Sequence, residues 1–192
     1  MRPPHSRLSV SPGFWVLLAL LCYLDQGEIL GLGLLSCALH ELGHFLAIRL
    51  LGGRIARLCL TAAGAELALD GARPLSYGRE CAAALAGPAA SLLTAELAAG
   101  CGLYLLAGLS LGQGLFNLLP ILPLDGGRAM GLLLISLGGE TRARKAMCVL
   151  SAVLSGVLLG GGLVLLRVFG NPTLLVTAAW LTVGQIKRGR GR

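Results

Sequence analysis

A short apolar segment of the sequence carries three residues that can do metal chemistry, in the order HELGH over residues 40–44. Residues four apart lie on the same face of a helix, so His40 and His44 can offer their imidazole nitrogens to one zinc ion. Glu41 projects beside them, where its carboxylate can take a proton from a water molecule that the metal activates. Because the chain has only three histidines, this spacing would arise by chance on the order of once per thousand such chains. The segment predicts a zinc site; the alternative is a pair of histidines that are hydrogen-bonded to neighbouring helices.

A second segment, NLLPILPLDGGR over residues 117–128, supplies a carboxylate. A catalytic zinc ion takes three protein ligands and keeps a fourth position open. The remaining histidine, His5, lies in the N-terminal tail, so the third ligand is expected to be a carboxylate or a cysteine. The prolines and glycines of the segment unwind a helix around Asp125, which lets its carboxylate turn toward a neighbouring element. Asp125 is therefore the candidate for the third ligand.

Asn117 stands at the start of the same segment. Its amide can donate a hydrogen bond to an oxyanion or to an unwound substrate strand. The same amide can instead satisfy the backbone of the interrupted helix. The residues alone favour neither interpretation.

The composition indicates what kind of protein positions these residues. Of the 192 residues, 55% are hydrophobic and 13% are charged, whereas a soluble domain has about 45–50% and about 25%. So little charge cannot cover a water-facing surface, and the 29 glycines have no period and lie inside apolar runs. These features argue against a soluble enzyme, a disordered tail and a basic nucleic-acid-binding domain. We therefore expect an integral membrane protein that forms a single membrane-embedded domain over residues 1–192.

The apolar runs predict about six transmembrane helices, and hence an all-α polytopic membrane protein. The expected spans are residues 14–25, 29–51, 80–106, 109–137, 146–166 and 173–186. Two prolines and a Gly-Gly pair interrupt the fourth span, and such a break is tolerated at membrane depth only where it is buried in protein or lines a wet cavity. Between the second and third spans, approximate alternation around Gly64 predicts a small membrane-associated β-hairpin over residues 53–72. The alternative for that segment is an ordered cytosolic loop without strands.

The net charge of +7 is explained by where the basic residues lie. Arginines and lysines cluster at alternate breaks between the apolar runs and at both ends of the chain. The other breaks are acidic, neutral or carry a single arginine. This is the positive-inside pattern, which predicts that both termini lie in the cytosol. The charge thus implies the lipid bilayer as a partner and no nucleic acid.

The depths of the chemistry-bearing residues can be compared at about 1.5 Å per helical residue. Counted from outer boundaries near Ile29 and Leu109, His40, His44 and Asp125 lie roughly 16, 22 and 24 Å inward. These depths agree. They predict one site in the inner half of the bilayer, open to cytosolic water.

The pair of motifs HELGH and NLLPILPLDGGR resembles the site-2 protease family of zinc intramembrane proteases. The likeness covers about residues 32–134 and is greatest to the short bacterial branch, typified by the sporulation protease that processes a membrane-tethered sigma-factor precursor. The resemblance implies one zinc ion per chain, with His40, His44 and Asp125 as ligands and Glu41 as the general base.

The third span carries a further, partial likeness. Its segment AGPAAS over residues 86–91 is similar to the family's GPxxN motif, with Ser91 in place of the asparagine. We interpret Gly87, Ser91 and the small residues between them as residues that allow close helix packing.

The motifs and the composition together predict a zinc-dependent intramembrane metalloendopeptidase in the bacterial cell membrane. Its partners would be a membrane-tethered protein, cleaved within or near its transmembrane segment, and a regulatory membrane protein. One alternative is a metal- or proton-coupled transporter, which would need polar residues along several spans, and the last two runs offer almost none. The other is an inactive scaffold of the same family, which would usually have lost Glu41 or a ligand.

Overall fold

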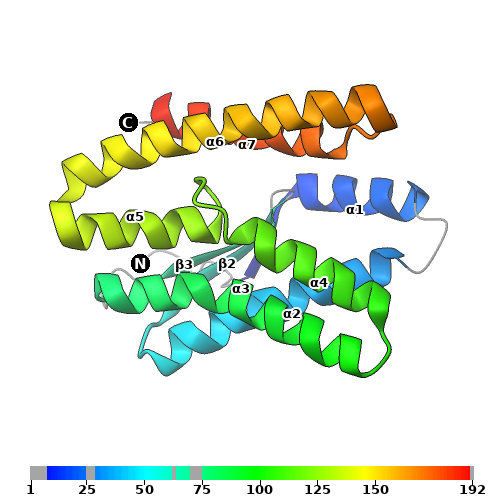
Figure 1. Ribbon diagram of the computed structural model, residues 1–192. Coiled ribbons are helices and arrows are strands. Elements are labelled where there is room, and N and C mark those ends of the chain that lie inside the picture. The colour runs from blue at the N-terminus through cyan, green and yellow to red at the C-terminus, as the bar shows by residue number, and fades with distance from the viewer. Residues whose placement is uncertain (1–7, 25–28, 62–63, 70–74, 191–192) are drawn as a thin grey trace. The chain divides into compact units, whose positions relative to one another are not determined.

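The computed structural model of the chain (Figure 1) describes residues 8–24, 29–61, 64–69 and 75–190. It divides the chain into two compact units, Met1–Phe116 and Asn117–Arg192. The described part of the first unit holds helices α1 to α4 and a small sheet, and that of the second holds helices α5 to α7.

Small residues bring the two long helices of the first unit together. The helices of this unit are α1 (Pro12–Leu24), α2 (Ile29–Leu50), α3 (Tyr77–Gly100) and α4 (Tyr104–Asn117). A Cβ atom on Gly43 of α2 would lie 2.6 Å from the Cβ of Ala90 and 2.7 Å from the carbonyl oxygen of Ala86, both in α3. A larger residue at Gly43 would therefore push the helices apart. Figure 1 shows α2 and α3 lying side by side.

Helix α4 contacts α2 through polar side chains, of which Ser36 and Ser110 are buried. The Ser36 hydroxyl donates to Oε1 of Gln113 at 2.7 Å, and its oxygen lies 2.9 Å from the hydroxyl oxygen of Ser110. Because a hydroxyl has one proton, Ser110 is the donor in the second bond. The three side chains hydrogen-bond to one another, as polar groups between apolar helices commonly do.

The sheet of the first unit has the order β1-β2-β3, with β1 (Leu8–Val10), β2 (Ile55–Thr61) and β3 (Gly64–Leu69). Strand β2 pairs with β3 in antiparallel fashion and with β1 in parallel fashion. The antiparallel pair lies in the segment 53–72, where the sequence predicted a hairpin. Residues 62–63 and 70–72 of that segment lie outside the described residues. Strand β1 was not predicted, because three residues are too few to show a period of two.

The second unit consists of α5 (Asp125–Gly138), α6 (Glu140–Phe169) and α7 (Thr173–Arg190). A Cβ atom on Gly162 of α6 would lie 2.7 Å from the backbone of Leu175 in α7, so these two helices also touch through a glycine. The Gln185 side chain of α7 donates to the hydroxyl of Ser155 in α6 at 2.8 Å.

Three helices of the described chain, α2, α3 and α6, are long and apolar enough to cross a membrane. Large apolar side chains such as Leu97, Val157 and Phe169 are exposed on α3 and α6, as expected for helices that face lipid. Helices α1, α4 and α5 have only 13, 14 and 14 residues, fewer than the ~20 that span a hydrocarbon core. The six predicted runs all contain helix, and the fourth is split into α4 and α5 as its prolines and glycines predicted.

The predicted end of the third span at residue 106 is wrong. Helix α3 ends at Gly100, and the chain turns through Gly102, which has a φ of +75°. The N–H groups of Gly102 and Leu103 then bond to the carbonyls of Ala99 and Ala98, which is the Schellman pattern of a helix end. Leucines continue after this turn, so hydropathy alone does not mark it.

The start of the fifth run was also placed too late. The fifth span was predicted to begin at residue 146, but α6 already begins at Glu140, directly after Gly139 with its φ of +79°. Glutamate, arginine and lysine are good helix formers. The apolar pattern therefore marks only the part of the helix that suits lipid, and the helix itself is longer than its apolar run.

Candidate metal centre

One face of α2 is buried at every fourth position, and the two histidines lie on it. The buried residues of this helix are Ser36, His40, His44 and Ile48. Only 3% of the surface of His40 and 7% of that of His44 is exposed. The spacing of four thus places both imidazoles on the side of α2 that packs against other helices, as the sequence predicted.

A backbone carbonyl of α3 fixes the ring of His44. Its Nδ1 lies 2.8 Å from the carbonyl oxygen of Ala83. A carbonyl can only accept, so Nδ1 carries the proton and Nε2 of the neutral ring presents a lone pair. Pro88 interrupts the hydrogen-bond ladder of α3 close to this carbonyl, because it has no N–H to donate to Ala84.

A side chain of α3 fixes the ring of His40. Its Nδ1 lies 2.8 Å from the hydroxyl oxygen of Ser91, which is 1% exposed. Ala83, Gly87 and Ser91 are spaced by four, so a single stripe of α3 serves both histidines. Metal-binding histidines typically bond their second ring nitrogen in this way.

The two Nε2 atoms converge on one point. They are 3.2 Å apart, and the ring planes meet at 80°. Two nitrogen ligands of a tetrahedral zinc ion, each about 2.0–2.1 Å from the metal, stand about 3.3 Å from each other. The spacing in the first unit is therefore the one that a shared zinc ion needs.

Glycine at position 87 makes room for this arrangement. A Cβ atom there would overlap the His44 ring, with Nε2, Cδ2 and Cε1 as its nearest neighbours. The packing role that the sequence suggested for Gly87 and Ser91 was thus incomplete, because both also contact the histidines. The signal in the sequence was their spacing of four, which matches that of His40 and His44.

In the second unit, a folded-back loop holds Asp125 at the first residue of α5, where 9% of its surface is exposed. Cβ atoms on the next two glycines would overlap this loop, at the carbonyl of Leu118 for Gly126 and at that of Ile121 for Gly127. The backbone N–H of Leu122 donates to the hydroxyl of Ser151 in α6 at 3.1 Å. The loop depends on both glycines and on Ser151, a residue that nothing in the sequence distinguished from other serines in apolar runs.

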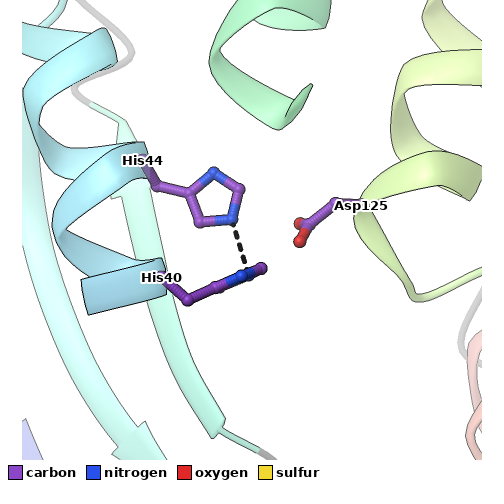
Figure 2. Close-up of side chains that lie close together, drawn as sticks. All are labelled: His40, His44 and Asp125. Atoms are coloured by element: carbon purple, nitrogen blue, oxygen red, sulfur yellow. Dashed lines mark hydrogen bonds between the residues drawn. The ribbon is translucent and has the colours of Figure 1, made fainter. Parts of the chain in front are cut away.

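The three predicted ligands are all buried: His40 and His44 on α2 of the first unit, and Asp125 at the start of α5 in the second unit (Figure 2). Two imidazole nitrogens and one carboxylate oxygen are a donor set that suits catalytic zinc and leaves a fourth position open.

Two further predicted residues are half-buried. Glu41 follows His40 on α2, and Asn117 is the last residue of α4. The roles of both stay predictions.

Residues 94–160 match the model of peptidase family M50. This range contains Asn117, Asp125 and Ser151, and the histidine segment lies before it. The solved structure titled "Site-2 Protease from Methanocaldococcus jannaschii" is similar to the chain with a TM-score of 0.72. The alignment covers 95% of this chain and 91% of the other at 23% sequence identity, so the likeness is one of fold. No curated protein matches the sequence.

We predict that Gly87→Ala lowers zinc affinity at least about tenfold, because the new methyl group displaces the His44 ring from its position. Gly100→Ala is the matched control, since a Cβ atom there, in the same helix, would meet open space. Competition with a chromophoric chelator on the purified proteins measures both affinities. Equal zinc binding by Gly87→Ala and Gly100→Ala would contradict the placement of the His44 ring.

Proposed function

We propose that this chain is a zinc-dependent intramembrane endopeptidase of the site-2 protease type. The observation that carries the proposal is the convergence of the two Nε2 atoms at 3.2 Å, with both Nδ1 atoms bonded to α3. The match to peptidase family M50 over residues 94–160 and the likeness of fold to a site-2 protease support it.

In this proposal His40, His44 and Asp125 hold one zinc ion, and the two units act as one catalytic domain. Zinc in such a donor set polarises the scissile carbonyl and activates water at neutral pH. Glu41 takes the proton from the attacking water and passes it to the leaving amine. Its place beside His40 on α2 suits this role, since the base must lie next to the reacting water.

A transmembrane substrate hides its peptide groups in its own helix, so it must unwind before it is cut. Asn117 would donate a hydrogen bond to the unwound strand or to the oxyanion. Strand β3 stands at one edge of the order β1-β2-β3, and a substrate strand can add to such an edge through main-chain hydrogen bonds.

The proposed setting is a bacterial cell membrane with both termini in the cytosol. Helices α2, α3 and α6, which are long and apolar enough to cross a bilayer, support a multi-pass arrangement. The substrate would be a membrane-tethered protein cut within or near its transmembrane segment, and a regulatory membrane protein would control access to the site.

We predict that Glu41→Gln keeps its zinc and loses at least about a hundredfold in cleavage rate, because the amide cannot accept the proton. Wild type and variant are purified, assayed for zinc, and reconstituted in liposomes with a panel of single-span test proteins. Equal cleavage by both would contradict the role of Glu41 as the base. Loss of zinc from the variant would show instead that the carboxylate is a ligand.

We predict that Asp125→Ala loses both zinc and cleavage, because two imidazoles alone do not make a catalytic zinc site. Glu96→Ala is the control, since it removes an exposed carboxylate of α3. Metal analysis after dialysis measures bound zinc per chain. An undiminished zinc content in Asp125→Ala would remove this residue from the ligand set.

A further inference from the structure

The two histidines have α3 partners of different chemistry. His44 faces the carbonyl of Ala83, which can only accept a hydrogen bond. His40 faces the hydroxyl of Ser91, which can donate or accept. The proton of His44 is therefore fixed on Nδ1, whereas that of His40 is free to occupy either ring nitrogen.

This difference matters because the two Nε2 atoms are 3.2 Å apart. His44 always presents a lone pair at that point, and a second lone pair from His40 would repel it. Without metal, the favourable arrangement has the proton on Nε2 of His40, which donates to His44, while the Ser91 hydroxyl donates to Nδ1 of His40. With zinc, both Nε2 atoms must be free of protons.

We propose that Ser91 is a positioning residue that lets His40 exchange tautomers when zinc binds. The inference rests on the proposed zinc site. When zinc binds, the proton on Nε2 of His40 leaves to water and a proton from water is taken up at Nδ1. The number of protons on the ring therefore stays the same. The Ser91 oxygen then accepts from Nδ1, and its own proton turns toward the carbonyl one helical turn before it. Thr94 in the same helix makes that bond, to the carbonyl of Ala90 at 2.8 Å.

Residues without a hydroxyl at position 91 would not give Nδ1 of His40 a hydrogen-bond partner in both the zinc-free and the zinc-bound state. A side chain that can only accept a hydrogen bond would hold the His40 proton on Nδ1. The Nε2 lone pairs of His40 and His44 would then face and repel each other in the metal-free protein. Alanine would leave Nδ1 without this partner in both states. The hydroxyl keeps both rings hydrogen-bonded before and after zinc binds, inside a site where unsatisfied polar groups are costly.

The first test is the zinc affinity of Ser91→Ala, measured by chelator competition on the full chain in detergent. We expect a loss of about 10- to 100-fold. Ser110→Ala is the matched control, because Ser110 is also a fully buried serine of the first unit and bonds to Ser36 instead of a histidine. An affinity of Ser91→Ala within about threefold of wild type would overturn the inference. A wild-type protein that binds no zinc would overturn the proposed function and this inference with it.

The second test reads the tautomers directly. The chain has three histidines, so the ¹⁵N spectrum of histidine-labelled protein contains three ring pairs, assigned by substitution. We expect His40 to carry its proton on Nε2 without zinc and on Nδ1 with zinc, while His44 keeps its proton on Nδ1 throughout. A proton on Nδ1 of His40 in both states would show that Ser91 acts as an acceptor alone, which contradicts the proposal.

Discussion

The close approach of α3 to α2 is the constraint on which the site depends. Two imidazoles on one helix face do not by themselves point their Nε2 atoms at one metal ion, because each ring can rotate about its side-chain bonds. The hydrogen bonds between the two Nδ1 atoms and their partners, the Ala83 carbonyl and the Ser91 hydroxyl, fix both rotations. These bonds form only because glycines at positions 43 and 87 let the helices touch.

The second unit presents a carboxylate from an interrupted apolar run. The loop before α5 folds back on the first turn of that helix, and the two glycines after Asp125 leave the space it needs. The bond from Leu122 to Ser151 ties the loop to α6. The break in the helix is thereby held by protein contacts, which is the condition under which irregular backbone is tolerated in a membrane.

The residues with unusual chemistry for their surroundings could be predicted from the sequence. Two histidines in an apolar run, and an aspartate in a run broken by proline and glycine, are costly unless they bind something, and the structure buries all three. The positions of the helix ends could not be predicted in the same way. Apolar residues continue through the turn at Gly102, and α6 begins with charged residues before its apolar run, so hydropathy places neither helix boundary correctly.

The partners of the histidines were beyond prediction for a related reason. Ala83 acts through its backbone carbonyl, which every residue has, so its identity carries no signal. Ser91 looked like a packing residue, because small side chains between membrane helices usually are. Only the register of α3 against α2, which is a property of the packed structure, shows which hydroxyl and which carbonyl meet the rings.

The central claim is that two imidazoles and one carboxylate hold a single zinc ion. X-ray absorption at the zinc edge of the purified, zinc-loaded protein tests it most directly. The account predicts one zinc per chain with nitrogen and oxygen ligands at about 2.0–2.2 Å, two of them imidazoles. A sulfur ligand at about 2.3 Å, or a spectrum without two imidazoles, would contradict it.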